Sequence, residues 1–539
     1  MTNNMFVYEY HSGQKVERLI VDCGIGFPEV EMYGVDLLVP DITYLKDKQD
    51  SLVGMILTHG HDDHIAALPY ILPQLKKQIP IYASELTAGF AESDLQEFNI
   101  KQKVKVFPNE SLRLGSFTIE PIRITHSVPD SRHLAIQTPE GTIYHGSDFK
   151  FDWTPIDGKR SDVQKMAYFG HKKVLMALVD CLRVENEGYS LSETKVGENL
   201  SREIRDVKGK VIVTMMSSNI HRIQQAIDAA VEHNRNIVFI GQSVEDNIQV
   251  SQELGFIRLP KSKVVHKRRL NKYADHELCL IVAGSQGQLD SSLNRIARGE
   301  HKLVTLRPSD HVIFSADPIP GNEQSVYDLI DKIAETGATV SYREIQDVMH
   351  VSGHASAEEM RLLLSLTSPK FIIPIGGTYR HMNQFKVLAT NMGWKEQDII
   401  LPKDGDIIAF DKDKVWIDNK IKLKTVMVDG LGVGDVGPLV LSDRKKMAKS
   451  GMVIVAVPID KKENQIISEP EVITRGFVFV RGSQQLIKDL TNFAAKILPK
   501  GMIIRNWQED REELEQRMTD YIYTATQREP LILGVLVKS

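Results

Sequence analysis

The fold of this chain is decided by Thr58-His59-Gly60-His61-Asp62-Asp63-His64. The stretch directly follows a short apolar run that predicts a β-strand. Neutral imidazoles and carboxylates suit zinc or manganese, and four ligand-type residues in six positions are what a two-ion site needs. In an extended loop His59 and His61 point to the same side, while Asp63 and His64 at the following turn can reach a second ion. We therefore expect a dinuclear metal site here, and not a polar surface loop with incidental histidines.

Three residues elsewhere in the chain could join this motif. His126 ends the predicted strand 117–125, and Asp148 follows the predicted strand 142–144. Each alone would be an ordinary turn residue, but together with the first motif they resemble the ligand set of the metallo-β-lactamase fold. Asp22 occurs where that fold carries a supporting aspartate, which would orient a ligand histidine. A plain turn residue before Gly24 remains an equal alternative.

Length and composition exclude several classes of protein. A chain of 539 residues is too long for one core and predicts about three domains. The net charge is −5, so any nucleic-acid surface must be a local groove. Only three cysteines occur, Cys23, Cys181 and Cys279, which argues against a disulfide framework and fits a reducing compartment. With neither a signal-peptide pattern nor an apolar run of roughly 18 residues, we expect a cytoplasmic protein without membrane contact.

The pattern of predicted elements changes along the chain. Short strands separated by turns fill the first 180 residues or so, and strand–helix alternation follows, which predicts βα units and a parallel sheet. Strands are expected at 210–215, 236–240, 278–283, 370–375, 452–458, 476–480 and 531–537, and helices at 219–233, 357–366 and 379–391, with two more near the C-terminus. The glycine-rich residues 429–437 indicate a linker or an ordered turn.

Beyond the metal motif, segments along the whole chain resemble ribonuclease J, a bacterial ribonuclease family. Besides His350-Val351-Ser352-Gly353-His354 they comprise residues 27–36, 126–130, 147–152, 218–222, 284–287, 318–322, 429–437 and 475–478. The resemblance implies an α/β fold in which a metallo-β-lactamase αββα sandwich is split in sequence. Its two parts would be residues 1–192 and 346–425, with a β-CASP α/β domain inserted at 193–345. A linker, 426–447, would precede a small C-terminal α/β oligomerisation domain, 448–539.

The resemblance also implies roles for individual residues. One ion would be held by His59, His61 and His126, the other by Asp63 and His64, and Asp148 would bridge them. The two divalent ions, zinc or manganese, would lower the pKa of a water molecule and neutralise charge on the scissile phosphate. Asp180 would orient a site histidine, and His354 would protonate the leaving oxygen. RNA phosphates would be cradled by Ser217, Ser218, Asn219, His350, Val351, Ser352, Gly353 and His354. Gly34, Asp36 and Asp429 match a structural calcium site of the family.

One family motif departs from its pattern here. The third β-CASP motif of ribonuclease J reads Pro-Ile-His-Gly-Glu-Tyr-Arg, whereas this chain has Pro374-Ile375-Gly376-Gly377-Thr378-Tyr379-Arg380. Gly376 therefore stands where the family has a ligand of the second ion, and we expect His381, in a predicted helix, not to reach the site. The pattern resembles the second, low-activity paralogue of ribonuclease J, so we expect a weakened second site. The chain also begins near the family's glycine-rich first turn, so we expect a truncated sequence or a lost first strand.

The function expected from these residues is that of a metal-dependent ribonuclease of RNA maturation and decay, acting as a 5′–3′ exonuclease, an endonuclease or both. The expected partners are RNA and either a second copy of the chain or a ribonuclease J paralogue. Two alternatives stay open: a catalytically inactive structural subunit of a ribonuclease complex, and a hydrolase of a small substrate such as a thioester. For the basic run 261–269 we favour a solvated loop over a contact with RNA phosphates.

Overall fold

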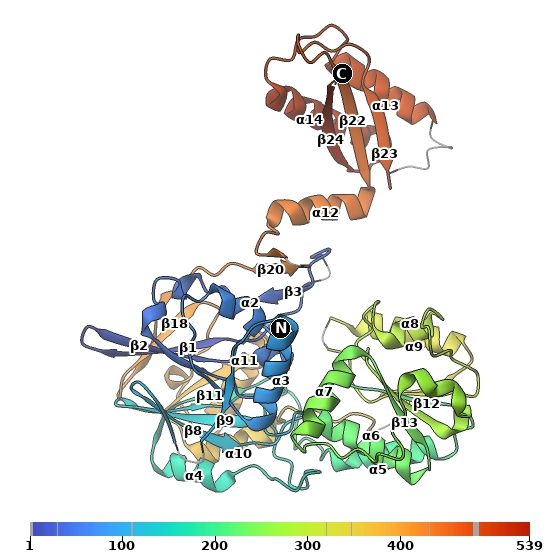
Figure 1. Cartoon of the computed structure of the whole chain (residues 1–539). Coiled ribbons are helices and arrows are strands. Elements are labelled where there is room, and N and C mark those ends of the chain that lie inside the picture. The colour runs from blue at the N-terminus through green and yellow to red at the C-terminus, as the bar shows by residue number, and fades with distance from the viewer. Residues whose placement is uncertain are drawn as a thin grey trace. The chain divides into compact units, whose positions relative to one another are not determined.

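The computed structural model of this protein describes residues 4–29, 31–108, 111–319, 321–346, 348–430, 432–477 and 484–538. The chain forms two compact units, drawn in Figure 1. The first comprises Met1–Phe27 and Leu37–Val426, and the second comprises Pro28–Asp36 and Met427–Ser539. The second unit thus takes in a short segment from near the N-terminus, which the sequence did not predict.

Two sheets of the first unit pack face to face. One has the order β1 (Phe6–Ser12), β2 (Lys15–Val21), β4 (Leu52–Ile56), β5 (Ile81–Ala83) and β6 (Val104–Val106). The other has the order β17 (Phe371–Ile375), β11 (Val174–Asp180), β10 (Gly141–His145), β9 (Arg132–Thr138), β8 (Phe117–Arg123) and β7 (Leu112–Leu114). Buried apolar residues from both sheets, among them Val21, Ile56, Ile136 and Met176, form the core between them.

Helices cover the outer faces of this sandwich. After β4 the chain forms α1 (Asp62–Ile65) and α2 (Leu68–Ile71). After β5 it forms α3 (Glu85–Glu97), which contacts β5 and β6. The second sheet packs on α4 (Val163–His171), α10 (Ala357–Thr367) and α11 (Tyr379–Asn391). The layers are therefore helix, sheet, sheet and helix, which confirms the predicted αββα sandwich.

The inserted domain is a parallel five-stranded sheet in the order β13 (Asn236–Ile240), β14 (Leu278–Val282), β12 (Val211–Thr214), β15 (His311–Phe314) and β16 (Thr339–Ser341). Its helices are α5 (Thr194–Arg205), α6 (Ile220–Glu232), α7 (Gln242–Glu253), α8 (Ser292–Ala297) and α9 (Glu323–Glu335) (Figure 1). The inner strands are buried along their whole length, as expected of a parallel sheet covered on both faces. The βα units predicted from the strand–helix alternation are confirmed.

The insertion returns the chain to the sandwich in a defined register. Strand β17 pairs in parallel with β11, so that Asp180 lies opposite Ile375. The ends of these two strands, which are far apart in sequence, therefore meet at one edge of the sheet, and Gly376 follows directly on β17.

The second unit has its own small core. Its three-stranded sheet has the order β23 (Glu471–Arg475), β22 (Met452–Ile459) and β24 (Leu531–Lys538), and one face packs on α13 (Gln484–Ile497) and α14 (Trp507–Thr526). The segment 426–447, predicted as a linker, contains β20 (Val426–Asp429), β21 (Gly432–Val433) and most of α12 (Pro438–Ser450). The remaining elements are β3 (Leu37–Val39), β18 (Asp406–Phe410), β19 (Val415–Lys420) and the 3₁₀ helices η1 (Thr43–Leu45), η2 (Gln49–Ser51), η3 (Leu72–Gln74), η4 (Lys267–Lys272), η5 (Asp275–Glu277) and η6 (Glu396–Asp398).

The prediction of a strand at 476–480 is wrong for residues 476 and 477, which the structure describes. The strand lies earlier, at Glu471–Arg475, and ends before Gly476. Gly476 has a φ of +66° and passes so close to Gly451 that a Cβ on Gly451 would lie 2.3 Å from the Gly476 carbonyl carbon. This left-handed backbone suits glycine and breaks the extended conformation. Residues 478–480 lie outside the described part of the chain.

A buried ion-pair network ties the inserted domain to the sandwich. The Arg222 guanidinium of α6 donates to both carboxylate oxygens of Glu193, at 2.7 and 2.9 Å. Lys150, which follows β10, has its Nζ 3.8 Å from Glu193 Oε2 and from Asp152 Oδ2. All four side chains are at least nine-tenths buried, so each charge depends on its partners and not on water.

Replacing Glu193→Ala should therefore destabilise the protein strongly. It would leave Arg222 buried without its carboxylate partner and Lys150 with Asp152 alone, and breaking a buried pair typically costs about 3–5 kcal/mol. The matched control is Glu198→Ala, which removes an exposed partner of Lys195 on α5 and should leave the thermal unfolding midpoint nearly unchanged. Equal midpoints for the two variants would show that the buried network does not hold the two domains together.

The helices of the described residues differ from membrane-spanning helices. None of them combines the length and the apolar character that crossing a bilayer demands.

Candidate metal centre

The metal motif lies between β4 and α1. Strand β4 ends at Ile56, the chain then runs through an extended loop, and α1 begins at Asp62 with His61 as its N-cap. The neighbouring chain passes this turn so closely that a Cβ on Gly24 would lie 1.6 Å from the Asp63 carbonyl oxygen. Only a glycine at position 24 lets the backbone support the loop at this distance.

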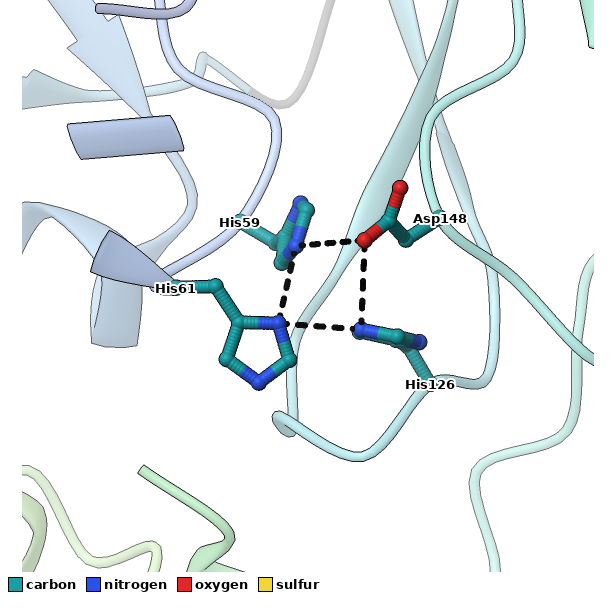
Figure 2. Close-up of side chains that lie close together, drawn as sticks. All are labelled: His59, His61, His126 and Asp148. Atoms are coloured by element: carbon teal, nitrogen blue, oxygen red, sulfur yellow. Dashed lines mark hydrogen bonds and ion pairs between the residues drawn. The ribbon is translucent and has the colours of Figure 1, made fainter. Parts of the chain in front are cut away.

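The structure brings three histidines and one carboxylate around a common point, as Figure 2 shows. His59 Nε2 lies 3.2 Å from His61 Nδ1, which lies 3.1 Å from His126 Nε2. Asp148 Oδ2 lies 3.7 Å from His59 Nε2 and 3.8 Å from His126 Nε2. Two ligands of a tetrahedral zinc ion, each about 2.1 Å from it, lie about 3.4 Å apart, so this group has the dimensions of a metal site.

A second group shares a member with the first. His64 Nε2 lies 3.7 Å from Asp63 Oδ2 and 3.7 Å from Asp148 Oδ2. The same Asp148 oxygen thus belongs to both groups, which is the arrangement of a bridging carboxylate. All six residues that the sequence singled out as ligands are gathered at one place.

Hydrogen bonds on the far sides of the rings fix their orientation. His64 Nδ1 lies 2.7 Å from Asp22 Oδ2, and Asp22 also accepts hydrogen bonds from the Thr58 backbone N–H and hydroxyl. His126 Nδ1 lies 2.8 Å from the Gly353 carbonyl oxygen. Donation from Nδ1 leaves Nε2 of both rings free to bind an ion. The structure thus shows the contact expected of an aspartate that supports a ligand histidine. Asp22 is also a turn residue, with a φ of +61°.

The electrostatics of the first group favour neutral rings. Burial, together with the neighbouring histidines, holds the pKa of His59 and His126 well below the usual value, and burial lowers the pKa of His61 to about 3. The imidazoles are therefore in the uncharged form that metal ligation requires. Burial would raise the pKa of Asp148, but His354 and His64 hold it well below the usual value, so this carboxylate stays ionised.

His354 and Asp180 form a pair beside the two groups. His354 Nδ1 lies 2.8 Å from Asp180 Oδ2, and His354 Nε2 lies 3.8 Å from Asp148 Oδ2. Burial alone would lower the pKa of His354, but Asp180 and Asp148 raise it to about 9. The ring is directed at the centre by the Asp180 carboxylate, which is 1% exposed.

Gly376 and His381 lie near this pair but add no ligand to the groups. Gly376 has a φ of +73°, and a Cβ there would lie 3.1 Å from Asp180 Oδ1. His381 uses Nδ1 to accept from the Thr378 backbone N–H, and its Nε2 lies 3.8 Å from Glu185. Within the described chain neither residue belongs to a metal-competent group, as the sequence led us to expect for His381.

The loop 350–354 is held from two sides. Arg222 donates to His350 Nδ1 at 2.6 Å and to the Val351 carbonyl oxygen at 3.0 Å, and the Gly353 carbonyl oxygen contacts His126. The Ser352 hydroxyl accepts from the His354 backbone N–H at 3.0 Å.

The other predicted phosphate-binding residues lie just before α6. Asn219 is its N-cap, and the side-chain oxygen accepts from the Arg222 backbone N–H, so this buried side chain has a capping role. Ser218 is buried and Ser217 is half-buried. Their segment precedes the helix that carries Arg222 and thus adjoins the loop 350–354 through that side chain.

At the predicted calcium site the structure has an arginine. The Arg444 guanidinium pairs with Asp429 and donates to the Tyr33 carbonyl oxygen at 2.9 Å, and it lies beside Gly34. Asp36 accepts from the Gly430 backbone N–H at 2.8 Å. A side-chain cation therefore lies opposite Asp429 here, and among the described residues neither Asp36 nor Asp429 belongs to a metal-competent group of His, Cys, Asp and Glu side chains, so the calcium site stays a prediction.

Sequence reasoning missed several residues of the centre. Asn4 reaches the second group, with its amide nitrogen 3.1 Å from His64 Nε2. Arg222, Glu193 and Lys150 fix the loops around the centre. Lys150 and Arg222 lie in segments that resemble the family, but the sequence assigned none of the four a role, and only the fold brings them to the site.

The fold and this centre define a class: hydrolases with a metallo-β-lactamase sandwich, two adjoining metal groups and an inserted β-CASP domain. The matching family models are "Beta-lactamase superfamily domain" (residues 17–165), "Ribonuclease J, beta-CASP domain" (208–333), "Zn-dependent metallo-hydrolase RNA specificity domain" (337–401) and "Ribonuclease J C-terminal domain" (439–539). The chain belongs to the ribonuclease J family.

Similarity to curated relatives extends over nearly the whole chain. The chain is 34% identical to Ribonuclease J2 of Bacillus subtilis, over 99% of this chain and 96% of that one. It is 34% identical to Ribonuclease J 1 of Streptococcus pyogenes, over 99% and 95% of the two chains. It is 35% identical to Ribonuclease J of Thermus thermophilus, over 97% and 91%. Identity to the relatives named J 1 and J2 is thus equal, and the match does not separate the two paralogues.

Replacing Asp22→Asn should weaken metal binding without unfolding the protein. Loss of the carboxylate removes the group that holds His64 Nδ1, and changes of this kind typically reduce metal affinity about 10–100-fold. Competition with a chromogenic chelator measures the affinity. Asp62→Asn is the matched control, because Asp62 lies at the start of α1, two residues from His64, and joins no metal-competent group among the described residues. Equal affinities for both variants would contradict the supporting role of Asp22.

Proposed function

We propose that this chain is a metal-dependent ribonuclease of RNA maturation and decay, which hydrolyses phosphodiester bonds as a 5′–3′ exonuclease, an endonuclease or both. The observation that carries the proposal is the gathering of two histidine–carboxylate groups around one Asp148 oxygen, in a chain of the ribonuclease J family. The matching RNA specificity domain supports RNA as the substrate.

In this proposal each ion has its own ligands. His59, His61 and His126 would hold the first, Asp63 and His64 would hold the second, and Asp148 lies within reach of both. Two divalent ions, zinc or manganese, would lower the pKa of a water molecule and neutralise charge on the scissile phosphate.

The chain's own residues handle the proton of the leaving group. Asp180 accepts from His354 Nδ1, so that His354 Nε2 is directed to the centre. Because its pKa is raised to about 9, His354 carries a proton at neutral pH and can deliver it to the leaving oxygen. Asp180 is a positioning residue, since it acts only through the imidazole.

RNA would lie along the loop 350–354 and the segment 217–219. Arg222 and His126 hold this loop by its backbone and by His350, which fixes where a phosphate would sit relative to the ions. Arg222 is itself saturated by Glu193, His350 and backbone carbonyl oxygens, so we assign it to positioning and not to phosphate binding.

Activity is proposed to be low because Gly376 offers no side chain to the second ion. The first group has three imidazoles, whereas His64 is the one imidazole of the second group, beside the carboxylates of Asp63 and Asp148. The second ion would therefore be held more weakly, and turnover would depend on a high metal concentration.

The test is hydrolysis of a 5′-monophosphorylated RNA with added manganese. The wild-type chain should hydrolyse the RNA slowly, and His61→Ala should abolish the reaction. Gly376→His should raise turnover at low metal concentration, at some loss of stability, because φ is +73° there and the new Cβ would lie 3.1 Å from Asp180 Oδ1. Fast turnover with two tightly held ions in the wild-type chain would contradict the proposed weakness of the second site.

The same assay separates the two alternatives. A structural subunit predicts no hydrolysis by the wild-type chain and unchanged RNA decay in a complex that contains His61→Ala. A small-substrate hydrolase predicts release from a thioester and none from RNA.

We further propose that the second unit joins two copies of the chain. One face of its sheet covers the core, but the other face presents Ile473, Leu533, Val535 and Val537, each at least 37% exposed. The register places Ile473, Ile454 and Leu533 in one row across the three strands, and Ala456 lies beside Val535. This face is mainly apolar with charges at its margins, so it complements itself in a twofold arrangement.

Replacing Val535→Lys should dissociate the copies, because it places a charge in the centre of the apolar face. Light scattering measures the mass of the purified chain. Gln516→Lys, on the exposed side of α14, is the control with the same gain of charge and should leave the mass unchanged. A monomeric wild-type chain would contradict self-association, and a dimer formed only with a ribonuclease J paralogue would identify that chain as the partner.

A further inference from the structure

We infer that Asn4 is a ligand of the second metal ion, through its side-chain carbonyl oxygen. The inference rests on the proposed two-ion function, and it names the group that completes the site where Gly376 has no side chain. It assigns a metal-binding role to a residue outside every sequence motif of the centre.

The backbone of Asn4 is fixed next to the metal loop. The Asn4 N–H donates to the Asp63 carbonyl oxygen at 3.2 Å, and the Asn4 carbonyl oxygen accepts from the Gly24 N–H at 2.9 Å. Residue 4 is thus held between the turn after β2 and the start of α1, and its side chain is half-buried.

The side chain ends at the donor atoms of the second group. The amide nitrogen of Asn4 lies 3.1 Å from His64 Nε2, 3.3 Å from Asp63 Oδ2 and 3.1 Å from the Asp63 carbonyl oxygen. Ligands about 2.1 Å from one ion lie about 3.0 Å apart in octahedral geometry and about 3.4 Å apart in tetrahedral geometry. The end of the Asn4 side chain therefore stands at a ligand's distance from both donor atoms.

A rotation of the amide brings the correct atom to the ion. Without a cation, the amide nitrogen donates to the ring nitrogen and the carboxylate around it. A half-turn about the last side-chain bond exchanges nitrogen for oxygen, which occupy nearly the same space. With a cation between these donors, the carbonyl oxygen faces the ion and the –NH₂ group turns away.

The two metal groups then differ in chemistry. The first has three imidazole nitrogens and one carboxylate, whereas the second has one imidazole and oxygens from Asp63, Asp148 and Asn4. Imidazole-rich sites suit zinc, and oxygen-rich sites suit manganese or magnesium. We therefore expect the second ion to be manganese in preference to zinc, because an amide oxygen, and not a histidine nitrogen, completes its site.

Metal content and the electron paramagnetic resonance of bound Mn²⁺ test the inference independently of activity. The metal-free full chain is titrated with Mn²⁺ as the wild type and as Asn4→Ala, Asn4→Asp and the surface control Asn391→Ala. We expect two ions in the wild type and in the control. Asn4→Ala should keep the first ion and bind the second at least tenfold more weakly. Asn4→Asp, which has the same size and a negative charge, should bind the second ion more tightly than the wild type.

Each outcome decides a separate point. Equal affinity of Asn4→Ala and the wild type for the second ion overturns the role of Asn4 but leaves the two-ion function standing. If Asn4→Ala does not fold, the comparison of Asn4→Asp with the wild type decides, and an unchanged affinity there overturns the inference. A wild-type chain that takes only one ion overturns the inference as well, and one that takes no ion overturns the proposed function with it.

Discussion

The centre depends on a single carboxylate oxygen. Asp148 Oδ2 lies 3.7–3.8 Å from nitrogen atoms of His59, His64, His126 and His354. Four imidazoles crowded into a water-poor space repel one another once any of them is protonated, and one ionised carboxylate among them reduces that repulsion. Both metal groups and His354 meet at this oxygen, so the geometry of the loop after β10 determines what the site can do.

The same loop is anchored a few residues later by buried charges. Lys150 and Asp152 join Glu193 and Arg222, and Arg222 continues to the loop 350–354. A buried ion pair is weak evidence for stability, because its desolvation offsets much of its attraction. Here its effect is geometric. It fixes the distance between the metal ligands on the sandwich and the loop that comes from beyond the inserted domain.

The sequence predicted what short-range patterns encode. Strand–helix alternation predicted the parallel sheet, and the spacing within residues 59–64 predicted one coherent metal motif, whereas the sandwich was implied by the resemblance to ribonuclease J. Asn4 could not be predicted in this way, since 60 residues separate it from His64 and one asparagine carries no pattern. Residues 476 and 477, the described part of the strand expected at 476–480, do not form a strand, because Gly476 adopts a positive φ that composition does not reveal. The pairing of Arg444 with Asp429 at the expected calcium site could not be predicted either, because Arg444 lies outside every motif of that site.

Arg444 has a practical consequence for experiments on this family member. In a protein with a structural calcium, a chelating agent removes scaffold and catalytic ions together, so that an inhibited sample is hard to interpret. Here the charge opposite Asp429 is covalently part of the polypeptide and stays in place when divalent ions are stripped. Treatment with a chelator should therefore leave the pairing of Arg444 with Asp429 in place while it removes ions from the centre around Asp148.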